Sequence, residues 1–170
     1  MIQVTLRPVV ESDLTVFDRE LHSPEGRGDF QWFGYRSGLH DRRALEANGL
    51  LTDDGGTLTV CADGEVAGRV QWGKAIWGPP ATSWCWTIGI LIRPALQGRG
   101  IGTEAQRGLA RYLFDHSWAN RIEASTDIRN IAERKALEKA GFTREGVLRG
   151  ALWRGGQWHD QVLYSLLRAD

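Results

Sequence analysis

The chain has 170 residues, and its 21 lysine and arginine residues balance 21 aspartate and glutamate residues. This balance gives no overall field that would steer the protein to nucleic acid or to an anionic membrane. The two cysteines, Cys61 and Cys85, form no closely spaced pair and are expected to be buried thiols, not a disulfide framework. Without an 18-residue apolar stretch, the chain is expected to be one soluble, cytoplasmic domain over residues 1–170.

The amino-terminal part is expected to contain one strand and two helices. Residues 2–7 alternate like a strand, and a short amphipathic helix follows, for which Ser12 or Asp13 is the expected cap. Residues 22–35 are rich in aromatic side chains and have no regular period. A second helix is expected over residues 37–48, because a glycine follows it directly.

Three strands are expected next. Residues 57–62 and 65–72 flank the dipeptide Asp63-Gly64, which supplies the positive φ angles of a two-residue hairpin turn. Residues 83–92 form the following strand. Gly89 within it indicates either a bulge or a place where another backbone or a ligand approaches.

The remainder is expected to alternate helix and strand before a final hairpin. Apolar residues recur with helical spacing over residues 101–115, and residues 121–126 are typical of a buried strand. A helix is expected over residues 130–139, started by an asparagine cap and ended by glycine. Two glycines then join the last two strands, 142–152 and 157–167.

The resulting order is β-α-α-β-β-β-α-β-α-β-β, with about seven strands and about four helices. The strand–helix–strand unit over residues 83–126 requires a right-handed parallel crossover, whereas the earlier hairpin is antiparallel. We therefore predict an α/β fold with a mixed central sheet.

The stretch QGRGIG, residues 97–102, places three glycines at the start of a predicted helix. Glycine costs roughly 1 kcal/mol relative to alanine in a helix. An ordinary turn without a ligand would explain these glycines. However, a helix amino terminus also offers unpaired N–H groups and a positive dipole end to phosphates. Glycines let a diphosphate approach, and an arginine adds a charged donor. The residues predicted to bind it are Gln97, Gly98, Arg99, Gly100, Ile101, Gly102 and Thr103.

A dinucleotide is one ligand with such a diphosphate. Gly100, Gly102 and Ala105 formally fit the fingerprint GxGxxG/A, and Glu123 lies near the distance of a ribose-binding acid. However, residues 93–96 separate the glycines from the preceding strand, and only one strand–helix–strand unit is present. A nicotinamide-dependent enzyme is thus an alternative, and a weak one.

Longer motifs favour another ligand. The run IGILIRPALQGRGIGTEA, residues 88–105, resembles the acyl-coenzyme A loop of the GNAT acetyltransferases. Residues 120–167 are similar to the carboxy-terminal half of their Rim-type branch, which acetylates amino termini of ribosomal proteins or free amines. The resemblance is close over about residues 85–167 and elsewhere extends only to element order. Its landmarks are Asn130, LEKAGF (137–142), EGVLRG (145–150), Gly156, Trp158 and Asp160.

The resemblance implies a GNAT fold in which two parallel strands, here around residues 86–92 and 121–126, splay apart. It implies that acetyl-coenzyme A lies in the gap, with its pantetheine arm paired to backbone of the first strand. Asn130 would hydrogen-bond that arm, although Asn130 and Glu133 also fit a capping box. The strand residues implied are Ile90, Leu91 and Ile92. No metal site is expected.

Amine acetylation needs a base for the acceptor ammonium, a donor for the oxyanion and an acid for the thiolate. A free N–H near Ile90 would serve as donor. The resemblance implies an acid at a tyrosine or a serine, but the matching positions hold Leu137 and Glu133. The candidates for the base are Glu123, Glu133 and Asp160 with His159, and each also has an ordinary structural explanation.

The acceptor is expected to meet the aromatic segment 28–35 and the last hairpin. Aromatic side chains there would clamp an apolar group, face a cationic amine, or simply pack into the core. The candidate acceptor contacts are Asp29, Phe30, Trp32, Tyr35, Trp84 and Trp86.

The leading hypothesis is an acetyl-coenzyme A-dependent N-acetyltransferase. Its acceptor would be a protein amino terminus or a small-molecule amine, such as an antibiotic or a metabolite. Because the habitual tyrosine and serine are missing, a GNAT-fold protein that binds acyl-coenzyme A without turnover is the alternative. A homodimer is an expectation of the resemblance alone, and neither nucleic acid nor membrane is an expected partner.

Overall fold

A computed structural model describes residues 2–170. Its strands are β1 (Val4–Pro8), β2 (Leu51–Thr52), β3 (Gly55–Ala62), β4 (Glu65–Ile76), β5 (Trp84–Ile92), β6 (Arg121–Asp127), β7 (Thr143–Arg154) and β8 (Gln157–Leu167). Its helices are α1 (Glu11–His22), α2 (Gly28–Gln31), α3 (Leu39–Asn48), α4 (Ile101–His116) and α5 (Ile131–Ala140), with a 3₁₀ turn, η1 (Pro94–Leu96).

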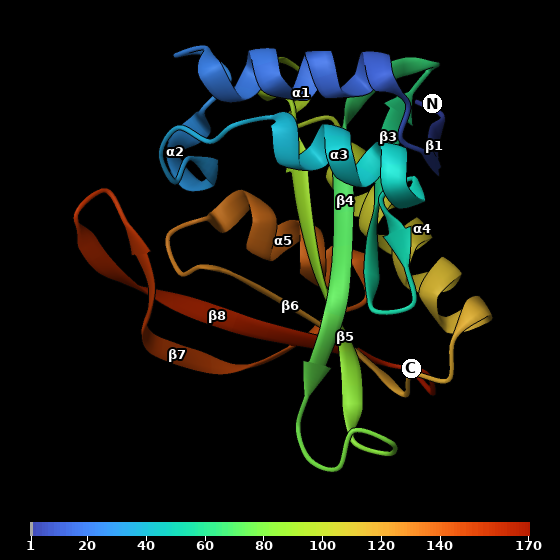
Figure 1. Cartoon of the computed structure of the whole chain (residues 1–170). Coiled ribbons are helices and arrows are strands. Elements are labelled where there is room, and N and C mark those ends of the chain that lie inside the picture. Colours follow the sequence, from blue (N-terminus) through green and yellow to red (C-terminus); the bar gives the residue numbers. More distant parts are fainter. Residues whose placement is uncertain (1) are drawn as a thin grey trace.

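Within the described residues, eight strands form one mixed sheet (Figure 1). The order is β1-β3-β4-β5-β6-β8-β7, with β2 paired to β3 outside this path. The expected α/β class with a mixed sheet is confirmed. Strand β2 and helix α2 are additions to the expected elements, because a two-residue strand and a single helical turn are too short to show a period.

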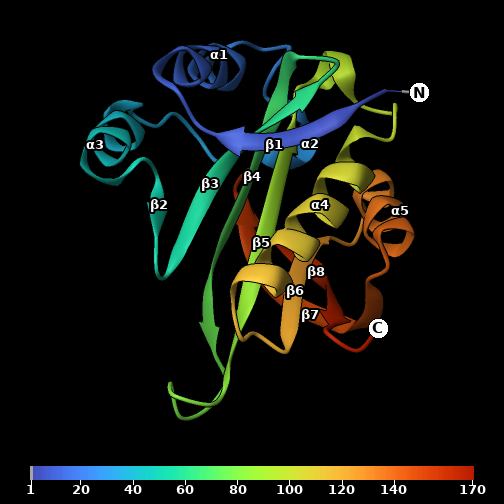
Figure 2. The ribbon, with the colours of Figure 1, turned by 90° about the vertical axis from the view of Figure 1, so that its right-hand side faces the viewer.

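Helices cover both faces of the sheet. Figure 2 shows α4 and α5 on one face and α1 and α3 on the other. The main core lies under α4, where Ile101, Ala105 and Leu109 pack among buried residues of the central strands. A smaller cluster under α1 contains Leu14 and Phe17. None of the helices in residues 2–170 combines the length and the apolar character needed to cross a membrane.

The expected cap of α1 is wrong. Val10 is the cap, and Asp13 lies inside the first turn, where its carboxylate accepts the Val10 N–H at 3.0 Å. Asp13 is 1 % exposed and also binds Arg7 at 2.6 Å and the Thr59 hydroxyl at 2.7 Å. The carboxylate thereby joins β1, α1 and β3, a role that its position in the sequence does not reveal.

The hairpin between β3 and β4 is confirmed. Asp63 and Gly64 form its turn with φ angles of 49° and 83°, as a two-residue turn requires. The closing hairpin of β7 and β8 turns at Gly155 and Gly156, which also have positive φ angles.

Strands β5 and β6 are parallel neighbours over only three residue pairs, from Trp86↔Ile122 to Ile88↔Ala124. Beyond Ile88, β5 continues beside β4 alone, while β6 continues beside β8. The register of β4 with β5 is unbroken through Gly89, so β5 has no bulge at this glycine. A Cβ at Gly89 would meet no heavy atom within 4 Å, which leaves the second explanation, an open approach to the backbone.

Shortening a core side chain of α4 tests this packing. Leu109 is 0 % exposed, so Leu109→Ala leaves a cavity and is expected to lower the free energy of unfolding by about 2–5 kcal/mol. Denaturant unfolding measures the change. Arg111→Ala, at an exposed position of the same helix, is the control and should stay within about 0.5 kcal/mol of the unchanged protein. Equal effects of the two substitutions would contradict the placement of α4.

Candidate functional site

Two cavities adjoin where β5 and β6 diverge. The strand cavity, of about 440 Å³, is lined by Ile88–Leu91 of β5 and Ala124–Asp127 of β6. The loop cavity, of about 510 Å³, is lined by residues 96–98 and 100–103 and by α5. The two cavities share the walls Phe30, Gln31, Ile90, Asn130 and Glu133. A ligand longer than either cavity can therefore lie along both.

The loop before α4 exposes a row of backbone donors. Gly98 and Gly100 have φ angles of 74° and 81°, in the left-handed region that favours glycine. Gly100 caps α4 without a side-chain hydrogen bond, and the first helical bond runs from the Glu104 N–H to the Gly100 carbonyl at 3.1 Å. Within residues 2–170, the N–H groups of residues 98–103 thus have no protein acceptor. This is the arrangement that binds phosphates at helix amino termini.

Cationic side chains surround this loop. Lys135 and Lys139 of α5 line the loop cavity opposite the glycines. Arg99 lies beside a neighbouring cavity that also contacts Gly100 and Lys139. Gln97 lines the loop cavity, and its side-chain amide donates to the Ile92 carbonyl at 2.9 Å, which ties the loop to the end of β5.

The expected strand residues lie at the divergence. Ile90 lines both cavities, Leu91 lines the strand cavity and Ile92 lines the loop cavity. Their backbone groups on the β6 side have no strand partner, since pairing with β6 ends at Ile88. Asn130 caps α5 by accepting the Glu133 N–H at 3.2 Å, and it lines both cavities.

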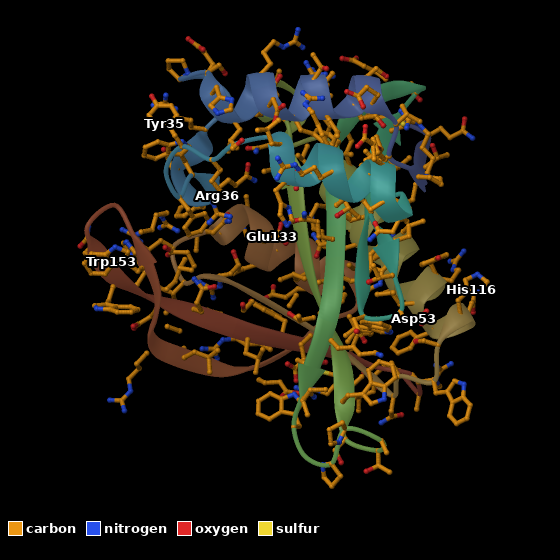
Figure 3. The ribbon with its side chains drawn as sticks, viewed as in Figure 1. Tyr35, Arg36, Asp53, His116, Glu133 and Trp153 are labelled. Atoms are coloured by element: carbon orange, nitrogen blue, oxygen red, sulfur yellow. The ribbon has the colours of Figure 1, made fainter. Side chains whose placement is uncertain are left out.

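Glu133 is the candidate base that lies at the cavities, near the start of α5 (Figure 3). Burial raises the pKa of its carboxyl to about 7, and the neighbouring Gln106 amide opposes part of that rise. Gln106 is itself buried, and neither of its amide atoms reaches the geometry of a hydrogen bond. The Glu133 carboxyl therefore exists in both protonation states near neutral pH.

The other two candidates lie elsewhere. The Glu123 carboxylate accepts from Arg121 at 2.6 Å beside the paired part of β5 and β6. Asp160 accepts the Gly150 N–H at 2.8 Å and joins the two strands of the last hairpin. Neither residue lines the strand cavity or the loop cavity, so the structure does not bring them together with Glu133.

Another carboxylate, Asp127, lies in the wall of the strand cavity. Burial alone would raise the pKa of Asp127, but hydrogen bonds from Arg129 and Arg154 hold it well below its usual range. His159 completes this group, with Nε2 at 3.0 Å from the Arg154 carbonyl and Nδ1 at 2.8 Å from the Arg129 guanidinium. Asp127 is therefore fixed as an anion. In residues 2–170, no group of three or more His, Cys, Asp or Glu side chains could hold a metal ion.

The expected acceptor contacts are divided. Phe30 lines both cavities and Asp29 lines the loop cavity. Trp32 and Tyr35 instead flank the Arg27 guanidinium, and Tyr35 points away from the cavities (Figure 3). The rings of Trp84 and Trp86 pack 5.0 Å apart. They lie at the end of β5 where it pairs with β6, and they line neither cavity.

Sequence reasoning missed several polar residues of the strand cavity. These are Arg36, Arg69, Gln71, Gln106, Asp127, Arg154 and Gln161. Gln106 interrupts the apolar stripe of α4, and a buried polar residue on such a stripe is a usable signal. The arginines lie on strands and loops, where no local pattern separates a cavity wall from a solvated surface.

The raised pKa of Glu133 has a consequence for stability. Between pH 4.5 and about 7, the native state retains a proton that the unfolded state releases, so this carboxyl lowers stability as the pH rises. Glu133→Gln is therefore expected to raise Tm by a few degrees at pH 8 and by less at pH 5, since about 1 kcal/mol corresponds to roughly 2–4 °C for a domain of this size. Thermal unfolding at both pH values checks this. Glu46→Gln, at an exposed site on α3, is the control, and a matching pH dependence in both variants would contradict the burial of Glu133.

Comparisons with known proteins agree with this geometry. The family description "Acetyltransferase (GNAT) domain" matches residues 3–143. The chain is 35 % identical over 113 residues to "Probable N-acetyltransferase YjcK" of Bacillus subtilis, covering 66 % of this chain and 61 % of that protein. It is 32 % identical over 83 residues to the [ribosomal protein uS5]-alanine N-acetyltransferase of Escherichia coli, covering 49 % and 43 %. The chain thus spans less than two thirds of the length of these curated relatives.

A solved structure shares the fold along the chain. RimJ of Mycobacterium smegmatis, in complex with a coenzyme A disulfide, superimposes with a TM-score of 0.77 at 24 % identity, covering 98 % of this chain and 82 % of that one. The relative named for acetylating a ribosomal protein confirms the resemblance to the Rim-type branch. With the family description matching residues 3–143 of 170, the chain belongs to the GNAT family of acetyltransferases.

Proposed function

We propose that this protein transfers an acetyl group from acetyl-coenzyme A to a primary amine in the cytoplasm. The observation that carries the proposal is the row of unpaired N–H groups at residues 98–103, which faces a cavity that continues into the gap between β5 and β6. RimJ, a structural neighbour, was solved in complex with a coenzyme A disulfide. The relative from E. coli is named for acetylating an alanine of a ribosomal protein.

The residues present fit such a cosubstrate. The glycine loop would hold its diphosphate with backbone N–H groups, and Lys135 and Lys139 would add positive charge. The free backbone of Ile90–Ile92 would pair with the pantetheine arm, with Asn130 on the opposite wall. Acetyl-coenzyme A supplies the activated acetyl thioester. The protein aligns it with the acceptor amine, and alignment alone accounts for a large part of such accelerations.

Glu133 is the residue that we assign to proton transfer. The acceptor ammonium must lose a proton before its nitrogen forms the new bond to the acetyl carbon, and the sulfur that leaves must gain one. A carboxyl whose pKa is about 7 accepts and returns protons efficiently at neutral pH. Glu133 lines both cavities, and this position supports a role in both transfers. A backbone N–H near Ile90 would stabilise negative charge on the carbonyl oxygen.

The acceptor is a protein amino terminus or a small-molecule amine. The relative named for uS5 supports the first, and the open strand cavity admits either. The homodimer implied by the motifs stays a prediction.

A charge placed in the glycine loop tests the diphosphate site. A Cβ at Gly102 would meet Ile90, Ile92 and Gln106 at 3.9–4.0 Å, which is ordinary contact, so substitution leaves the fold intact. Gly102→Asp is expected to weaken coenzyme A binding at least tenfold more than Gly102→Asn, which is matched in size but uncharged. Isothermal titration calorimetry measures both affinities. Unchanged binding in both variants would remove the loop from the site.

The pH dependence of thiol release tests Glu133. With an acceptor found in a panel of amines and peptides, kcat/KM is expected to fall below about pH 7 as Glu133 becomes protonated. Glu133→Gln should lower kcat/KM by about 10²–10⁴ and remove that inflection, while Glu133→Asp should keep part of both. A Gln variant with the full rate would exclude Glu133 as the base. Tight coenzyme A binding with no release for any acceptor would favour a binding protein without turnover.

A further inference from the structure

The strand cavity holds positive charge that acetyl transfer does not require. Arg36, Arg69 and Arg154 all line it. Arg69 is 3.3 Å from Asp41, but Arg36 is exposed and makes no ion pair within residues 2–170. Figure 3 shows Arg36 on the segment after α2, directed toward the β7–β8 hairpin and α5. The mouth of the cavity therefore carries a cation that no protein carboxylate neutralises.

Buried donors without acceptors lie deeper in the same cavity. Arg154 is 8 % exposed and Gln161 is 7 % exposed. Arg154 uses Nη2 to bind Asp127, while its Nη1 has no hydrogen-bond partner in the described residues, and neither has Nε2 of Gln161. Gln161 is the register partner of Asp127 across β8 and β6, and all three residues line the strand cavity. A buried polar group left unpaired costs about 1–3 kcal/mol, and native proteins usually give such groups a ligand or an ordered water.

We propose that Arg154 and Gln161, with Arg36 at the mouth, form a carboxylate-binding subsite, so that the acceptor is an amine that also carries a carboxylate. The guanidinium is the side chain whose donors best match a carboxylate. Asp127 cannot fill the subsite, because its own position is fixed by Arg129 and Arg154. The Phe30 ring lies over the Arg154 guanidinium, with its centroid at 5.3 Å, and forms part of the wall of the same cavity.

For the amine of the acceptor, this inference rests on the proposed acetyl transfer. For the carboxylate of the acceptor, it rests on the arginines of the strand cavity. Glu133 lines the same cavity, so one molecule can present its ammonium to Glu133 and its carboxylate to Arg154. The same chemistry is present in a free amino acid and in a peptide with an acidic residue near its amino terminus. A polyamine, which carries only positive charge, is disfavoured by the arginines.

Matched acceptors separate these sources. Amino acids are compared with their carboxamides, and short peptides with Asp or Glu at the first two positions are compared with their Asn or Gln counterparts, with thiol release as the readout. We expect the carboxylate member of at least one series to have a kcat/KM about tenfold or more above its neutral partner. The series that shows the preference identifies the source. Equal rates within both series would overturn the proposal.

Variants assign the preference to the named residues. Arg154→Gln is expected to reduce the ratio of carboxylate to amide kcat/KM about tenfold, and Arg36→Gln about two- to fivefold because Arg36 is exposed. Arg43→Gln, at an exposed position on α3 outside both cavities, is the matched control and should leave the ratio unchanged. Arg154 also binds Asp127. If Arg154→Gln fails to fold, the ratio measured with Arg36→Gln still tests the assignment. An unchanged ratio in Arg36→Gln and in a folded Arg154→Gln would refute the assignment.

A titration that needs no turnover distinguishes the two proposals. Propionate and propionamide are added separately to ¹⁵N-labelled protein, and the side-chain amide of Gln161, assigned with Gln161→Leu, is followed by NMR. We expect propionate alone to shift this signal, and the shift to be lost in Arg154→Gln and weakened in Arg36→Gln. No shift, or equal shifts with both compounds, would mean that water alone satisfies these donors, and the subsite would be wrong. If coenzyme A binds but no amine is acetylated, the proposed transfer fails while this titration still decides the subsite.

Discussion

The architecture depends on the short parallel contact between β5 and β6. Three residue pairs hold the two strands together, and after Ile88 each strand follows a different partner. Their facing backbone groups are then left unpaired in the interior, which is costly unless something else pairs with them. The amino ends of α4 and α5, at Gly100 and Asn130, both lie at this opening. The positive dipole ends of both helices thus lie at the opening, and the unsatisfied donors come from the loop before α4 and from the free edge of β5.

Two carboxylates of the strand cavity have opposite environments. Asp127 is buried but bound by Arg129 and Arg154, which keep it ionised. Glu133 is half-buried and makes no ion pair within residues 2–170, so desolvation dominates and raises the pKa of its carboxyl toward neutrality. Paired titratable groups whose surroundings push their pKa values apart commonly divide an active site into a fixed charge and a proton carrier. Here the fixed charge orients Arg154, and Glu133 is the residue that we propose carries the proton.

Local patterns predicted most elements and the glycine loop, because hairpin turns, helix caps and positive φ angles depend on near neighbours. Asp63-Gly64 and Gly100 are examples. Choosing among Glu123, Glu133 and Asp160 requires knowing which strand or helix surface faces the gap between β5 and β6. The spacing of apolar residues along the chain does not give that information. Glu123 is paired with Arg121, two residues away on the same strand. Arg154 and Gln161 meet only through the register of β6 and β8, a long-range property.

Helix α2 has one consequence of its own. It is a single turn, Gly28–Gln31, with no buried residue, yet Phe30 and Gln31 belong to the walls of both cavities. A displacement of this turn that admits a molecule on one side reshapes the surface met on the other. This one turn therefore borders the sites proposed for both substrates. A substitution at Phe30 or Gln31 is expected to alter the binding of acetyl-coenzyme A and of the acceptor together.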